Sequence, residues 1–311
     1  MLKKLNSAKL QNTRWTGIFS ALIGASLFGV SGTVSSILFI TYNVPYTALV
    51  TFRMLVSGGI ALVVLRPKFP RNDIPLFLIF AVAGLFGVQY TYLAAIFYSN
   101  APTATLLQYM FFPMVMGYEA LRKRIRNVGP VILSLIVALI GIYELTTSFP
   151  YHSTSIILDP LALIFGLLSA LTAALYTILS GPLMRKNGSV SVISWSLFIG
   201  GLFSSLPGAG PLVEYFTHTG VIHLPYPILL FLFVAIFGTL LAFGLYIRSM
   251  EQISATQASI SATMEPITAA VSSAILVGTV LTFFQYVGGF LIILAIFIAT
   301  FFSDQASGIK N

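Results

Sequence analysis

The stretch YTALVTFRMLVSGGIALVVL, residues 46–65, is the clearest indication of the fold class. Its only charge is that of Arg53, and about 20 apolar residues cross the ~30 Å hydrocarbon core of a bilayer. The basic, turn-forming segment Arg66-Pro67-Lys68-Phe69-Pro70-Arg71 follows directly. Short cytoplasmic loops are enriched in Lys and Arg. Residues 46–65 therefore predict a transmembrane helix that ends on the cytoplasmic side.

Similar apolar stretches recur along the whole chain. Of its 311 residues, 57% are hydrophobic and only 8% are charged, whereas soluble proteins carry roughly 25% charged residues. The composition therefore predicts an all-α, multi-pass membrane protein. The predicted spans are Gly17–Ile40, Tyr46–Leu65, Ile74–Tyr98, Ala101–Leu121, Val128–Leu145, Pro160–Leu183, Val190–Leu206, Pro227–Met250, Ser254–Val277 and Phe283–Phe302. Turns are expected between them, including one at Pro207-Gly208-Ala209-Gly210-Pro211, and hairpins at the charged segments Arg122–Arg126 and Arg185–Gly188.

The basic residues predict the topology. With the N-terminus inside and ten crossings, every Lys and Arg of the 16 except Arg53 falls in a cytoplasmic segment, and the outer segments hold none. This is the positive-inside pattern, which predicts cytoplasmic termini and a location in the cell membrane. We assign the net charge of +8 to orientation and to contact with anionic membrane lipid. Nucleic acid is not expected as a partner.

The chain also shows signs of internal duplication. A shift of 154 residues aligns Gly84 with Gly238, and after a one-residue slip Pro113 aligns with Pro266. Two five-helix repeats are expected, over residues 17–145 and 160–302. Because five is odd, the second repeat enters the membrane inverted, and inverted repeats are typical of transporters that bind substrate near the midplane.

Two charges inside the predicted spans are the first candidates for function. Arg53 lies roughly 10 Å below the outer face at 1.5 Å per residue, and Glu265 lies close to the midplane. Intramembrane ionisable groups normally face a cavity or a partner. Arg53 is expected either to recognise an anionic group such as a carboxylate or to form a structural ion pair or backbone clamp. Glu265 is expected to exchange a coupling proton, to contact a substrate amine, or to remain a structural group held by Arg53.

Two prolines, Pro113 and Pro266, are expected to interrupt corresponding helices. Each removes a backbone donor, and paired broken helices in two repeats point to a transporter site, although packing kinks are the simpler alternative. Hydroxyl groups near Pro266 are expected either to bind the freed carbonyl or to line a polar cavity. Side chains near these interruptions and at mid-depth complete the set of candidates for substrate binding or coupling. They are Gln89, Tyr92, Gln108, Tyr109, Tyr176, Tyr246 and Ser261. For the aromatic ones, a role at the membrane interface or in packing is the alternative. Ser261 lies four residues before Glu265 and is expected on the same helix face.

Several functional classes find no support. The chain has no Cys, its three histidines lack metal-ligand spacing, and no phosphate-binding or hydrolase motif is present. We therefore expect no metal and no cofactor. An intramembrane enzyme would need a catalytic cluster, and a channel would need rings of charged or carbonyl groups. Both stay as alternatives to a transporter.

Ten predicted spans and three short motifs carry a resemblance to a known family. The motifs are Thr51-Phe52-Arg53, Glu265-Pro266 and Gln285-Tyr286-Val287-Gly288-Gly289. In these features the chain resembles the EamA-type exporters of the drug/metabolite transporter superfamily. The resemblance implies a central cavity, alternating access, and export of amino acids, related metabolites or drugs. The prediction is a secondary transporter of small organic solutes, monomeric or homodimeric, with proton exchange at Glu265 as a candidate coupling.

Overall fold

The structure is a computed structural model that describes residues 2–98, 101–122, 128–147, 159–218, 225–278 and 282–302. These residues form helices and their connections, without strands, so the all-α prediction is confirmed for them. The helices are α1 Leu2–Tyr42, α2 Tyr46–Leu65, α3 Ile74–Ile79, α4 Gly87–Tyr98, α5 Ala101–Gln108, α6 Phe111–Leu121, α7 Val128–Thr147, α8 Pro160–Asn187, α9 Ser189–His218, α10 Pro225–Ala235, α11 Ala242–Ser249, α12 Ala255–Ser261, α13 Met264–Val277 and α14 Phe283–Phe302. Two π-helical segments, η1 (Phe80–Phe86) and η3 (Ile236–Leu241), join α3 to α4 and α10 to α11.

Several helices are long and apolar enough to cross a membrane. Within the described residues six helical runs meet this description, and the apolar stretches Val128–Glu144 and Tyr286–Ile298 are shorter. The six are Arg14–Tyr42, Tyr46–Leu65, Ile74–Tyr98, Pro160–Asn187, Ser189–Thr217 and Pro225–Ser249. The two remaining predicted spans, 101–121 and 254–277, are each divided into two helices.

The divisions fall at corresponding places. The first lies at Tyr109-Met110, four and three residues before Pro113, and the second at Ala262-Thr263, four and three residues before Pro266. A proline cannot bond to the carbonyl four residues earlier. Both helices are therefore interrupted where that carbonyl loses its partner, as the prolines predicted. The two π-helical segments also occupy matching positions, each near the middle of its run.

The predicted turn at Pro207–Pro211 is wrong, because α9 runs through it without interruption. Prolines are tolerated in membrane helices when neighbouring groups bind the freed carbonyls. Here the hydroxyl of Thr51 on α2 donates to the Ser204 carbonyl at 2.8 Å, next to the Phe203 carbonyl that Pro207 frees, and so joins α2 to this part of α9. Gly208 serves close packing instead of a turn, since a Cβ on it would overlap Thr51 and the Thr47 carbonyl.

The charged segment 185–188 is also more helical than expected. Arg185 and Lys186 lie in the last turn of α8, which ends only at Gly188 with φ 80°. Cations stabilise the carboxyl end of a helix, so these residues extend α8 beyond its apolar part. Most of the other predicted hairpin, at 122–126, lies outside the described residues.

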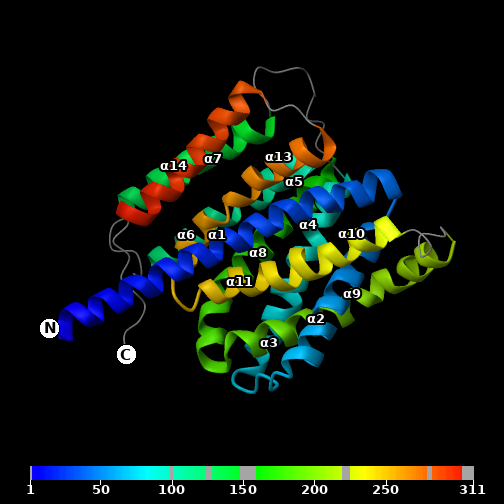
Figure 1. Ribbon diagram of the computed structural model, residues 1–311, viewed down its shortest axis with the longest axis horizontal. Helices are drawn as coiled ribbons and strands as arrows, with labels where there is room; N and C mark the ends of the chain where they lie inside the picture. The colour runs from blue at the N-terminus through cyan, green and yellow to red at the C-terminus, as the bar shows by residue number, and fades with distance from the viewer. Residues whose placement is uncertain are drawn as a thin grey trace.

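The helices pack in pairs around a central group. In Figure 1, α7 and α14 lie side by side at one edge of the molecule, and they pack against each other. Helix α2 packs against α9, α4 against α8, and α1 against both α11 and α13. Helix α1, which begins the chain, thus runs across the middle of the assembly (Figure 1) and packs against helices of the second half of the chain.

The distribution of polar groups is that of a membrane protein. Large apolar side chains such as Leu171 on α8 and Phe290 on α14 are exposed on the outside. Ser and Thr residues such as Ser57 and Thr239 are fully buried. Polar groups turned inward and apolar groups turned outward suit a lipid environment.

Candidate functional site

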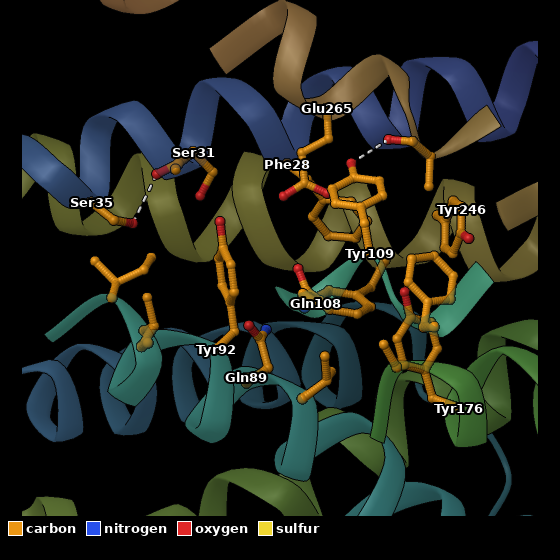
Figure 2. A pocket seen from close by; sticks show the side chains of 18 of the residues that line it. Phe28, Ser31, Ser35, Gln89, Tyr92, Gln108, Tyr109, Tyr176, Tyr246 and Glu265 are labelled. Atoms are coloured by element: carbon orange, nitrogen blue, oxygen red, sulfur yellow. Dashed lines mark hydrogen bonds between the residues drawn. The ribbon is translucent and has the colours of Figure 1, made fainter. Parts of the chain in front are cut away.

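A central cavity of about 70 Å³ lies between α1, α2, α4, α8, α11 and the two helix interruptions. A volume of this size holds about five water-sized particles. Figure 2 shows side chains from helices far apart in the sequence pointing into it. Eight of the predicted site residues line the cavity: Arg53, Gln89, Tyr92, Gln108, Tyr109, Tyr176, Tyr246 and Glu265.

Ser261 is the predicted site residue that does not line the cavity. Its side chain is buried and donates to the Gln257 carbonyl at 2.9 Å, within its own helix. The expectation that it shares a face with Glu265 assumed an uninterrupted helix. Because α12 ends at Ser261 and α13 begins at Met264, the four-residue spacing no longer places the two side chains on one face.

The two interruptions contact each other. The Ala262 carbonyl loses its usual partner four residues on because Pro266 has no N–H. It accepts instead from the Glu265 backbone N–H and from the Tyr109 hydroxyl, both at 2.9 Å. Tyr109 lies at the matching interruption of the other predicted repeat and is 1% exposed. The hydroxyl that binds this carbonyl therefore comes from the other interruption and not from a residue close to Pro266.

The π-helical segment η3 holds Arg53. The Arg53 Nε donates to the Thr239 Oγ1 at 2.8 Å, and Nη2 donates to the Gly238 carbonyl at 3.3 Å. Ser57, one turn further along α2, donates to the Ala235 carbonyl at 2.6 Å. The wider turn of a π-helix changes the hydrogen-bond register of its carbonyls, and η3 here presents one to Arg53. Arg53 therefore binds the backbone of a neighbouring helical segment, as the backbone-clamp interpretation expects.

Arg53 and Glu265, both described, do not form an ion pair, since no nitrogen and oxygen of the two lie within 4.0 Å. They nevertheless line the same cavity. Arg53 is 6% exposed, and its remaining N–H groups have no hydrogen-bond partner among the described residues. Glu265 lies in the first turn of α13, where a carboxylate interacts favourably with the helix dipole. A solute between them would meet groups of opposite charge.

Sequence reasoning missed the contribution of α1. Phe28, Ser31 and Ser35 line the cavity (Figure 2), although none of them is among the candidates that the sequence offers. Thr239, which binds Arg53, was missed as well. A usable signal was present in both places: Ser31 and Ser35 are one turn apart, and Thr239 is the only polar residue of Ile236–Leu241.

Glu119, near the end of α6, is a buried carboxylate that does not line the cavity. Its side chain is 2% exposed, and its carboxylate accepts from the Thr256 backbone N–H at 3.1 Å and from the Thr256 hydroxyl. Thr256 lies in the first turn of α12, whose preceding residue Ser254 forms a capping box with Gln257. Glu119 therefore completes the cap of α12 and joins it to α6.

The comparisons with known proteins agree with a transporter. The sequence model of the EamA-like transporter family matches residues 160–301. An uncharacterized inner membrane transporter, YicL, from Salmonella typhimurium is 31% identical over 285 residues, covering 89% of this chain and 92% of the relative. An uncharacterized transporter from Archaeoglobus fulgidus is 27% identical, covering 67% of this chain and 70% of its own.

A solved structure described as "Crystal structure of protein" matches with a TM-score of 0.73, over 91% of this chain and 98% of its own. At 16% identity this likeness shows the fold alone. The family relationship favours transport over catalysis and places the chain among multi-pass membrane proteins. The residues lining the cavity, the apolar helices and the similarity to YicL lead to one conclusion: the chain belongs to the EamA-like transporter family of the drug/metabolite transporter superfamily.

Proposed function

We propose that the protein is a secondary transporter that exports small organic solutes across the cytoplasmic membrane by alternating access. The observation that carries the proposal is the central cavity, where Arg53 and Glu265 lie beside the junction of two interrupted helices. Ligand sites built from discontinuous helices near the midplane are characteristic of secondary transporters. Amino acids, related metabolites and drugs are the solute classes considered.

The proposed architecture is ten crossings in two inverted repeats, residues 17–145 and 160–302, with both termini in the cytoplasm. Matching helix interruptions at Tyr109-Met110 and Ala262-Thr263 support the repeats, as do the matching π-helical segments. Five crossings per repeat give the second copy the opposite orientation, and rocking of one copy against the other exposes the cavity to each side in turn.

The orientation has a direct chemical test. A Cys at position 153, which lies outside the described residues, is expected to react with an impermeant thiol reagent added to intact cells, because the proposed topology places it outside. A Cys at the exposed Lys68 is the matched inner control and is expected to react only after permeabilisation. The chain has no native Cys to confuse the result. Labelling of Lys68→Cys in intact cells would contradict the topology.

In the proposed mechanism Glu265 carries the coupling proton or contacts a substrate amine, while Arg53 recognises an anionic group. A thermal-stability screen of amino acids and related metabolites first identifies a solute, because a ligand of the folded state raises its apparent stability. Efflux of that solute from proteoliposomes is then measured with and without an imposed proton gradient. Wild-type efflux is expected to respond to the gradient.

Replacing Glu265 by Gln tests whether this residue carries the coupling proton. The variant keeps the shape of the side chain but cannot lose a proton, so efflux is expected to become independent of the gradient. Glu214→Gln, at an exposed position of α9 outside the cavity, is the matched control and is expected to behave as wild type. An unchanged response in Glu265→Gln would disprove proton coupling at this residue.

Monomer or homodimer remains the expected oligomeric state.

A further inference from the structure

Residues that line the cavity together with Arg53 carry buried polar groups that the described residues leave without partners. The Ser31 hydroxyl and the Gln89 side-chain amide nitrogen are both buried, both line the cavity, and neither has a hydrogen-bond partner among the described residues. Ser31 is 2% exposed and Gln89 5%. Buried polar groups are nearly always hydrogen-bonded, because an unpaired one costs about 1–3 kcal/mol. The Tyr246 hydroxyl, on a third residue that lines the cavity, also has no partner among the described residues. Unpaired polar groups gathered on residues that line one cavity point to a polar ligand.

Ser31 and Arg53 converge on the same glycine. The Gly238 carbonyl accepts from Arg53 Nη2, and a Cβ on Gly238 would overlap the Oγ and Cβ of Ser31. The absence of a side chain at Gly238 therefore leaves the space that the Ser31 hydroxyl occupies. Helix α4, which carries Gln89, packs against α2, which carries Arg53.

We propose that Arg53, Ser31 and Gln89 form a subsite for a single carboxylate, which rests on the proposed transport function and specifies the anionic group it recognises. A guanidinium, a hydroxyl and an amide N–H are all hydrogen-bond donors, and a carboxylate has acceptor positions for several of them. Arg53 supplies the charge, and the two neutral donors complete the coordination.

Size and charge favour a small monocarboxylate over a phosphate. The cavity holds about five water-sized particles, and Arg53 is the only basic residue among those that line it. Glu265 lines the same cavity, and its carboxylate would repel a second negative charge. The subsite therefore selects a singly charged carboxylate on a short organic chain.

The test uses three probes of similar size on the purified full-length protein: sodium propionate, propionamide and propylammonium chloride, at equal ionic strength. Thermal unfolding is measured as a function of probe concentration to obtain each Kd. Propionate is expected to stabilise the wild type more than the other two. Ser31→Ala is expected to weaken propionate binding about 10- to 100-fold, the usual effect of losing a hydrogen bond to a charged group. Gln89→Leu is expected to act in the same direction.

Ser35→Ala is the matched control. Ser35 lies one turn away on α1 and lines the same cavity, but its hydroxyl already donates to the Ser31 carbonyl at 2.8 Å. Its removal is expected to leave propionate binding unchanged. Equal losses in Ser31→Ala and Ser35→Ala, preferential binding of propylammonium, or no binding of propionate would each overturn the subsite.

Solute efflux from proteoliposomes separates this outcome from failure of the proposed function. If efflux of the solute found by screening persists while propionate does not bind, the carboxylate subsite is wrong and the transporter assignment stands. If propionate binds as expected but no solute is transported, the subsite stands and the proposed function is wrong.

Discussion

Replacing Thr239 by Val is expected to remove one of the two hydrogen bonds that hold Arg53 to η3. The Thr239 hydroxyl makes two hydrogen bonds, accepting from Arg53 Nε at 2.8 Å and donating to the Val234 carbonyl at 2.8 Å. Thr239 is fully buried, so water does not replace the lost partner. Valine has nearly the same shape, so the substitution removes the hydrogen bonds and leaves no cavity.

The size of the effect follows from these two bonds. A hydrogen bond to a charged group contributes about 1.5–3 kcal/mol in soluble proteins. Interhelical bonds in membranes average about 0.6 kcal/mol, with a maximum near 1.7 kcal/mol, because the unfolded chain also finds partners. Arg53 keeps its second bond to the Gly238 carbonyl. We therefore expect Thr239→Val to lower the free energy of unfolding by about 1–3 kcal/mol.

Unfolding in mixed micelles by increasing mole fraction of a denaturing detergent, followed by tryptophan fluorescence, measures this difference. Thr239→Ser is the matched control, since it retains the hydroxyl and is expected to recover most of the lost stability. If Thr239→Val unfolds like the wild type, the hydroxyl does not hold Arg53. If Thr239→Ser loses as much as Thr239→Val, the lost methyl group and not the hydrogen bond explains the effect.

Further predictions concern helix contacts. Gly29→Ala is expected to destabilise the protein by about 1–3 kcal/mol, because a Cβ there would overlap α13, whereas Gly32→Ala on the same helix is expected to be neutral because its Cβ meets no heavy atom within 4 Å. Glu119→Ala is expected to cost about 1–3 kcal/mol by leaving the Thr256 donors unpaired, and Glu119→Gln, which keeps an acceptor oxygen, to cost less. Tyr109→Phe is expected to lose about 1 kcal/mol with its bond to the Ala262 carbonyl. Unfolding in denaturing detergent measures the free energy of unfolding of each variant. Equal stability of Gly29→Ala and Gly32→Ala, or of Glu119→Ala and Glu119→Gln, would contradict the contact concerned.

Hydropathy predicted most helix bounds well. Tyr46–Leu65 and Phe283–Phe302 begin and end where expected, and Ile74–Tyr98 does so as one run containing η1. Apolar length and turn residues are local properties, so they are visible in sequence. The prediction failed at Pro207–Pro211, where two prolines and two glycines suggest a turn but α2 packs closely enough to keep the helix intact. That contact joins segments more than 150 residues apart and has no local signal.

The candidate site, like the helix bounds, could be predicted from the sequence only in part. Which side chains are too polar for lipid can be read from the sequence alone, since an isolated charge in hydrocarbon is unfavourable wherever the helix is placed. The sequence also determined where prolines interrupt two helices. Only the tertiary structure decided that Arg53 binds Thr239 and Gly238 and forms no ion pair with Glu265, and that Ser31 of α1 joins the same cavity. Those choices depend on which helices are neighbours and on how they are rotated, and apolar helices of similar composition do not encode this locally.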